Sequence, residues 1–289
     1  MMFGSYMDES FDKQPTGVFA VGGILGRGIP LFELERRWEK LLRQPGIDIK
    51  YFKASDCQSG TGEFAKFVID PKHITADERA KLDSISHDFL RLIAHPVLFD
   101  PRPFLCVQGT GVVQGDFYDI IKDPKARAVL GDSPYWLAYH LAMIQCAWAM
   151  KELGDGQPGN YVSFDCDQDQ EHSSGAEKAY KDLKATNPNA SEYMGSFSSR
   201  DEKECFALQA ADAAMFEVRR ALNLALKLWP GALRDQFNLL ADDRLVFLVT
   251  HTNREQLEWI VANHKPGDPF KLDELMNLQL GDNIDKLRP

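Results

Sequence analysis

The chain has 289 residues, of which 44% are hydrophobic and 26% are charged, values that are typical of a soluble globular protein. Its formal net charge of -10 disfavours binding of nucleic acid by overall electrostatics, because phosphate contacts need Lys and Arg. An enzyme with an acidic metal site and locally concentrated basic residues is still compatible with this charge. Five cysteines without a CxxC pair, no signal-peptide pattern and no membrane-length apolar run predict a cytoplasmic protein without disulfides.

The first predicted element is a short strand over residues 4–10, which ends in two carboxylates. A polar turn and a near-continuous apolar run over residues 18–25 follow, so the two segments predict a hairpin in the middle of a sheet. Side chains alternate along a strand, which places Asp8 on one face and Glu9 on the other. A buried strand-end acid needs a compensating cation or donor, and an acid that caps the turn is the alternative.

Helical spacing of apolar residues predicts a helix over residues 31–43, and alternation predicts a third strand over residues 47–52. The polar loop that comes next carries Glu63. The later predicted elements are a helix over 75–94, extended chain over 97–113, helices over 135–153, 174–185, 205–229 and 253–263, and strands over 161–167, 192–198 and 244–250. We expect one domain over residues 1–229 with helical insertions. The C-terminal extension, residues 230–289, is expected to pack on the same domain, and its tail from residue 265 is expected to be an arm on the surface.

The long helix predicted over residues 205–229 carries one acid within its apolar stripe. The stripe recurs at 3.6-residue spacing and comprises Leu208, Ala211, Met215, Val218, Leu222 and Leu226. Asp212 lies inside this stripe, and Gln209 lies one turn before it. A carboxylate on a core-facing stripe is uncommon unless it is paired or binds a metal, and pairing with an arginine or with backbone N–H groups is the alternative.

Strand-end acids and this helical acid together are what an oxygen-ligand divalent metal site requires. Mg2+ and Mn2+ prefer carboxylates and water, and two such ions about 4 Å apart activate a water and stabilise a leaving oxygen. Asp165 and Asp167 share a face of the strand over 161–167, although Asp167 could instead cap the next helix. The order of elements favours an α/β fold with a ribonuclease H-like mixed sheet, in which three antiparallel strands plus parallel strands are flanked by helices.

Three motifs resemble a prokaryotic family called domain of unknown function 3800. They are Tyr6-Met7-Asp8-Glu9-Ser10 with Gly22-Gly23 soon after, Phe164-Asp165, and Leu208-Gln209-Ala210-Ala211-Asp212-Ala213-Ala214. The resemblance spans about residues 5–220. In its middle motif Cys166 stands where the family has an acid, so either Asp165 alone or Asp165 with Asp167 serves. The resemblance implies a ribonuclease H-like fold and, by fold analogy, nucleolytic activity.

We therefore expect hydrolysis of phosphodiester bonds in DNA or RNA, with Mg2+ or Mn2+ as cofactor. The expected catalytic residues are Asp8, Glu9, Asp165 and Asp212. The expected metal ligands are Asp8, Asp165, Asp167 and Asp212. The expected substrate-binding residues are Arg200, Lys203 and Gln209, the last of which orients Asp212 or bonds the backbone. Glu63 is a further candidate ligand, for which an ordinary surface-loop acid is the alternative.

Other classes of function have less support. The chain has no HExxH or CxxC motif for zinc chemistry and no elbow motif for nucleophilic catalysis. Sugar kinases and actin-like ATPases need glycine-rich turns after their acid-bearing strands, and this chain has no glycine at those places. The main alternative is a non-enzymatic binding or regulatory protein with a ribonuclease H-like core, in a defence or mobile-element context. Metal-dependent stability without turnover would favour that alternative. The sequence favours no particular oligomeric state.

Overall fold

The computed structural model describes residues 2–11, 16–95, 104–153, 159–168, 173–241 and 245–266. Within these ranges six strands form one mixed sheet, in the order β5-β4-β1-β2-β3-β6. Their bounds are β1 Met2–Ser10, β2 Val18–Arg27, β3 Leu105–Val113, β4 Tyr161–Asp167, β5 Met194–Arg200 and β6 Val246–Thr252. β2 is antiparallel to both of its neighbours, whereas the other pairings are parallel, so β2 alone runs against the rest of this described sheet.

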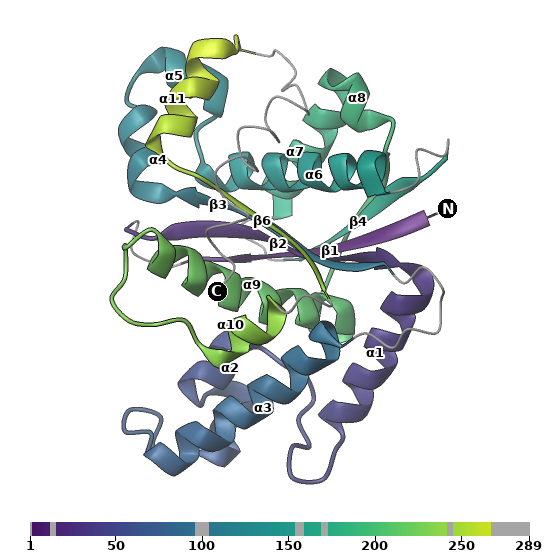
Figure 1. Cartoon of the computed structure of the whole chain (residues 1–289), viewed down its shortest axis with the longest axis vertical. Coiled ribbons are helices and arrows are strands. Elements are labelled where there is room, and N and C mark those ends of the chain that lie inside the picture. Colours follow the sequence, from purple (N-terminus) through teal and green to yellow (C-terminus); the bar gives the residue numbers. More distant parts are fainter. Residues whose placement is uncertain are drawn as a thin grey trace.

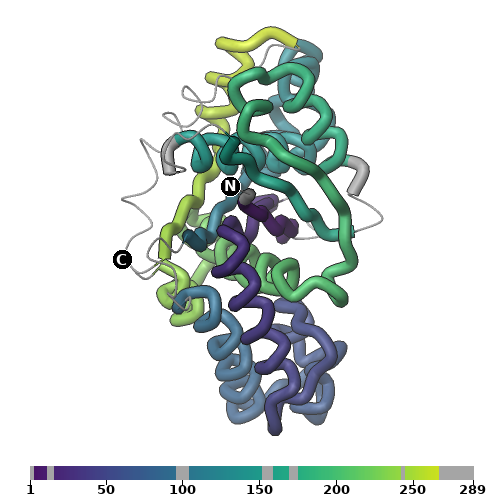
Figure 2. The backbone as a smooth tube through the Cα atoms, turned by 90° about the vertical axis from the view of Figure 1, so that its right-hand side faces the viewer, coloured from purple at the N-terminus to yellow at the C-terminus, as the bar shows by residue number. Residues whose placement is uncertain are grey.

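Helices cover both faces of the sheet (Figure 1). One face carries α4 Gln114–Ile120, α5 Pro124–Leu130, α6 Pro134–Leu153, α7 Ser173–Thr186, α8 Pro188–Ser191 and α11 Arg254–Asn263. The other face carries α9 Phe206–Ala225, with α1 Gly28–Leu42, α2 Ala54–Ser59, α3 Ala76–Ala94 and α10 Asp235–Leu240 beyond it. Figure 2 shows that the purple and blue helices extend the molecule below the green α9, along its long axis.

Two apolar cores lie on the two faces of the sheet, as the alternation of strand side chains requires. Met7, Leu25 and Phe164 pack with α6 on one face. Ala20 and Ile24 pack with α9, α1 and α3 on the other. The apolar α6 is thus a buried core helix, and no helix in the described ranges has both the length and the apolar character to cross a membrane.

Glycines allow α9 to lie directly on β1, β2 and β3. A Cβ atom at Gly23 would clash with the carbonyl oxygen of Tyr6 and would lie 2.6 Å from the Cβ of Ala211 on α9. A Cβ atom at Gly109 would lie 2.9 Å from the Cε of Met215. Both distances are shorter than van der Waals contact, so the close approach of α9 depends on the missing side chains.

The expected mixed α/β sheet flanked by helices is confirmed, and so is the hairpin of β1 and β2. The third strand predicted over residues 47–52 is wrong, because this segment joins no strand. Side chains bind its backbone instead: the N–H groups of Lys50, Phe52 and Ala54 donate to side-chain oxygens at 2.9, 3.0 and 2.5 Å. The third antiparallel strand is β3, which falls within the extended chain predicted over residues 97–113.

The C-terminal extension contributes to the same sheet. Its strand β6 pairs in parallel with β3, and α11 covers the face that also carries α4 and α5. The predicted arm after residue 266 and the first part of the extended chain, residues 97–103, lie outside the described residues. The described extension is therefore continuous with the fold of the preceding residues.

Candidate functional site

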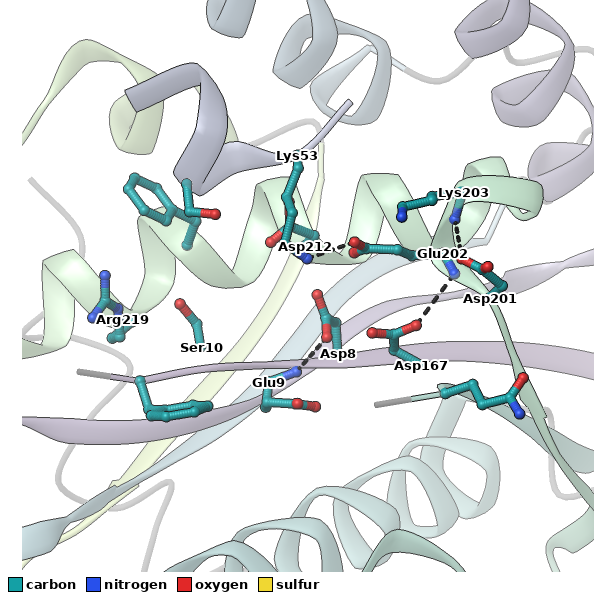
Figure 3. A pocket seen from close by; sticks show the side chains of 14 residues that line it. Asp8, Glu9, Ser10, Lys53, Asp167, Asp201, Glu202, Lys203, Asp212 and Arg219 are labelled. Atoms are coloured by element: carbon teal, nitrogen blue, oxygen red, sulfur yellow. Dashed lines mark hydrogen bonds and ion pairs between the residues drawn. The ribbon is translucent and has the colours of Figure 1, made fainter. Parts of the chain in front are cut away.

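A pocket of about 570 Å³ opens at the carboxyl end of β1, between the sheet and α9 (Figure 3). The pairing of β1 with β4 ends at Met7 and Cys166, so Asp8 and Asp167 follow on neighbouring parallel strands and reach the same edge. Asp212 of α9 and Glu202 of the short 3-10 helix η2 Glu202–Glu204 face them across the pocket. Carboxylates from distant parts of the chain thus line one cavity, and Glu9 and Asp201 also belong to its lining.

Asp8 is the most enclosed of these acids, with 4% of its surface exposed. Burial raises the pKa of its carboxyl well above the usual range, and the charges of Glu9, Asp212 and Glu202 raise it further. Its Oδ1 accepts a hydrogen bond from the Glu9 N–H at 2.8 Å. A carboxylate in this position gains from any cation that enters the pocket.

Asp212 is held by the first residue of α2. Its Oδ2 accepts a hydrogen bond from the Ala54 N–H at 2.5 Å. Burial raises the pKa of Asp212, although the Lys53 ammonium and the bond from Ala54 oppose this effect. The acid on the apolar stripe of α9 is therefore a buried member of the pocket, as the sequence anomaly indicated.

Glu202 is a member of the pocket that the sequence did not predict. Its backbone N–H donates to Oδ1 of Asp167 at 3.2 Å, which links η2 to the end of β4. Burial, and then the charge of Asp212, raises the pKa of Glu202 to about 7. Its Oε2 atom is buried and has no hydrogen-bond partner among the described residues. A buried carboxylate oxygen without a partner indicates a functional site. The sequence Asp201-Glu202-Lys203-Glu204 does not reveal it, because such a run of charged residues is typical of an exposed segment.

Lys53 brings a positive charge among these acids. Its Nζ lies 2.5 Å from Oε1 of Glu202. Burial lowers the pKa of Lys53, but the charges of Asp212, Glu202 and Asp8 prevail and raise it above its usual range. The preceding residue, Phe52, is fully buried against the rings of Trp38, Phe64 and Phe89, and this aromatic cluster fixes where Lys53 enters the pocket.

Asp165 does not line the pocket. Its Oδ1 lies 2.8 Å from Nε of Arg200 and accepts a hydrogen bond from the Ser198 hydroxyl. Arg200, expected to bind substrate, is therefore engaged with an acid outside the pocket lining. Of the two acids on β4, the structure places Asp167 with Asp8 and Asp212.

Glu9 borders the pocket, but its carboxylate lies on the face of β1 that α6 covers. The Tyr139 hydroxyl donates to Oε2 of Glu9 at 3.0 Å. Glu9 therefore acts on Asp8 through its charge and its backbone N–H, rather than joining the other carboxylates. The alternation of side chains along β1 predicts this opposite placement.

Gln209 is completely buried and does not line the pocket. Its Oε1 accepts hydrogen bonds from Nε1 of Trp38 and from the Phe52 N–H, both at 3.0 Å. Its Nε2 donates to the carbonyl oxygen of Glu202 at 3.0 Å. Gln209 is thus a positioning residue, which ties the backbone beside both Lys53 and Glu202 to α9.

Two other residues that the sequence analysis singled out, Lys203 and Glu63, lie in different parts of the structure. Lys203 lines the pocket, and its Nζ lies 5.4 Å from the centre of the Tyr51 ring. Glu63 lies in the 3-10 helix η1 Gly62–Phe67, where its Oε2 accepts a hydrogen bond from the Lys50 N–H at 2.9 Å. Of the two, only Lys203 is placed to meet a ligand in the pocket.

The donor set of the pocket fits Mg2+ or Mn2+, which bind carboxylate oxygens by preference. Asp8, Asp167, Asp212 and Glu202 supply these oxygens, and Oε2 of Glu202 is buried without a partner among the described residues. Among the residues that the structure describes, no group of three or more Asp, Glu, His or Cys side chains lies close enough together to hold a metal ion in the present conformation.

The fold and the pocket define the class of this protein, an α/β protein with a mixed sheet and an open acidic pocket at the end of its central strands. Among known proteins, no family model, no curated protein and no solved structure matches the chain.

Proposed function

We propose that this protein is a divalent-metal-dependent nuclease with a ribonuclease H-like fold, related to the domain of unknown function 3800 family. The element order supports the fold. The antiparallel pair β1 and β2, the strand β3, a helix, a strand that ends in Asp167 and a later helix with Asp212 follow one another, although the third strand lies at residues 105–113 and not at 47–52. The first and last of the three motifs that carry the resemblance contribute Asp8 and Asp212 to the pocket, whereas Asp165 of the middle motif lies outside its lining.

One observation carries the proposal: carboxylates from residues 8, 167, 202 and 212 line a single pocket. Buried acids of like charge destabilise one another, so a fold keeps several of them together at a cost in stability. Such a cost is typical of a functional site. Divalent ions bind to this kind of carboxylate cluster in enzymes that cleave phosphodiester bonds.

Asp8, Asp167, Asp212 and Glu202 would hold the ions, and bound ions would supply an activated water and charge stabilisation at the leaving oxygen. The chain itself supplies the positions of the ligands. The Ala54 N–H orients Asp212, and the Glu202 N–H orients Asp167. Lys203 and Arg219 lie on opposite sides of the acids in Figure 3, so a phosphate chain crossing the pocket would meet a cation on either side.

Exchange of the pocket acids tests the proposal. Purified protein is incubated with Mn2+ or Mg2+ and with single- and double-stranded DNA and RNA oligonucleotides. Asp8→Asn and Asp212→Asn each remove one charged ligand but keep the side-chain shape, so we expect each to lower the rate of cleavage by about 100-fold or more. Chelation of the metal should stop cleavage by the wild type.

Asp165→Asn is the matched control, since Asp165 lies on β4 but outside the pocket lining. We expect this variant to keep most of the activity, whereas Asp167→Asn should lose it. Circular dichroism of all variants checks that they fold. Undiminished cleavage by both Asp8→Asn and Asp212→Asn, or cleavage that survives chelation, contradicts the proposed function.

A further inference from the structure

The pocket holds its own cation. The Lys53 ammonium contacts Oε1 of Glu202 at 2.5 Å, while Oε2 of Glu202 is buried and lacks a partner among the described residues. Asp212 and Asp8 also act on Lys53 by charge. One lysine thus faces three acids that the proposed function assigns to metal ions.

The backbone on both sides of Lys53 is anchored to α9. The Phe52 N–H donates to Gln209, and the Ala54 N–H donates to Asp212. The stem of Lys53 therefore enters the pocket from a fixed point, and only its flexible side chain is free to change position. Lys203, by contrast, has an exposed side chain on the short helix η2, with its ammonium over the Tyr51 ring.

Buried carboxylates of like charge need a counter-charge, because an unpaired buried charge strongly destabilises the fold. An ammonium supplies one positive charge to the cluster, whereas a divalent ion supplies two and also takes oxygen ligands directly. A lysine among metal-binding carboxylates stabilises the ion-free protein and competes with the ion for the same oxygens.

Building on the proposed function, we propose that Lys53 is an internal counter-cation: it pairs with Glu202 in the ion-free protein, and a divalent ion must displace it in order to bind. Lys53 thereby sets the metal concentration at which the site fills. The lysine also keeps the acids together until the ion arrives.

Calorimetry with Mn2+ alone tests this role in the full chain. Replacing Lys53 by methionine keeps the length of the side chain and removes its charge, so we expect Lys53→Met to bind Mn2+ about tenfold more tightly than the wild type does. Lys203→Met is the matched control, because it removes the same charge from the exposed side of the pocket. Its affinity for Mn2+ should stay within about twofold of the wild type, since solvent screens an exposed charge.

Thermal unfolding gives a second measurement that does not depend on turnover. Without ions, Lys53→Met should unfold at a lower temperature than the wild type, because Glu202 loses its partner. Saturating Mn2+ should then raise its midpoint more than it raises that of the wild type, since ligands that bind the folded state stabilise it. Lys53→Arg keeps the charge, and we expect it to bind Mn2+ no more tightly than the wild type does.

The outcomes separate this inference from the proposed function. Equal uptake of Mn2+ by the wild type and Asp8→Asn would contradict the metal site itself, and with it the role of Lys53. Uptake that Asp8→Asn abolishes, together with equal affinities of Lys53→Met and Lys203→Met, would leave the metal site intact and overturn only the role of Lys53. If Lys53→Met does not fold even with Mn2+, an affinity of Lys53→Gln no higher than that of the wild type overturns it equally.

Discussion

Gln209, Asp212 and Glu63 show how single side chains replace a neighbouring strand. The N–H groups of Lys50, Phe52 and Ala54 lie two residues apart, as on a strand that faces a partner. Each donates to one of the three side chains instead. Residues 47–52 therefore have the alternating pattern of a strand without belonging to a sheet. Sequence periodicity reports which groups are buried, but not whether the partner of a backbone group is a strand or a side chain.

The charged residues of the pocket differ in how far the sequence reveals them. Asp8 and Asp212 stand out because a carboxylate at a buried strand end or on an apolar helical stripe is unusual. Glu202 and Lys53 lie in polar segments where charged residues are ordinary, so no local pattern marks them. Only the folded arrangement, with Gln209 holding both segments against α9, brings these two residues into the pocket.

Glu202 gives the ion-free protein a specific pH dependence. Burial raises the pKa of Glu202 from 4.5 to about 7, so between these values the folded state binds more protons than the unfolded state. The stability from this group is complete below pH 4.5 and is lost as the pH rises through 7. Glu202→Gln removes the titration, and we therefore expect its free energy of unfolding to fall less than that of the wild type between pH 5 and about pH 8.

Urea unfolding of both proteins across this pH range, with a chelator present, measures the difference. Glu192→Gln is the control, because Glu192 is exposed at the end of α8 and its exchange should leave the pH profile of the wild type unchanged. Parallel profiles for Glu202→Gln and the wild type would show that Glu202 does not titrate with a raised pKa.

The site depends on how closely α9 approaches the sheet. Gly23 lies under Ala211, one residue before Asp212, and leaves no space for a side chain. Gly23→Ala must push α9 away or distort β1 at Tyr6, so we expect the free energy of unfolding to fall by more than about 2 kcal/mol. The affinity for Mn2+ should fall as well, because Asp212 moves with the helix.

Gly28→Ala is the matched control for this substitution, measured by the same urea unfolding. A Cβ atom at Gly28, the first residue of α1, meets no heavy atom within 4 Å, and alanine favours a helix more than glycine does. Its stability should equal or exceed that of the wild type. A loss for Gly23→Ala no larger than the change for Gly28→Ala would mean that α9 tolerates a wider spacing.

The two acids of β4 have different positions relative to the pocket. Asp165 and Asp167 are two residues apart, so they share a face of the strand and the sequence pattern treats them alike. Their distances from the strand end decide their roles. Asp165 lies beside Tyr6 within the pairing of β1 and β4 and reaches Arg200, whereas Asp167 lies at the carboxyl end and opens into the pocket. Strand register, which the sequence alone does not supply, makes this distinction.

For the molecule as a whole, the sequence predicts the class of fold and the order of most helices and strands, because apolar periodicity is strong in the central strands and in α9. It does not predict that the C-terminal extension adds a strand to this sheet. β6 joins the sheet beside β3, at the edge opposite β5. A parallel pairing across more than a hundred residues leaves no short-range pattern, so only the assembled sheet shows it.

The docking of α9 on β1 and β2 also orders events in time. Residues 8 and 53 leave the ribosome long before residues 202 and 212, and α9, which packs against β1 and β2, is made only after all of them except residue 212. Contacts between such distant parts of a chain form late in folding, since the intervening loop must close first. The acidic pocket is therefore completed only after α9 has been made, and a nascent chain that stops before residue 206 already carries Asp8, Asp167 and Glu202 without Asp212 and without the helix that lies over them.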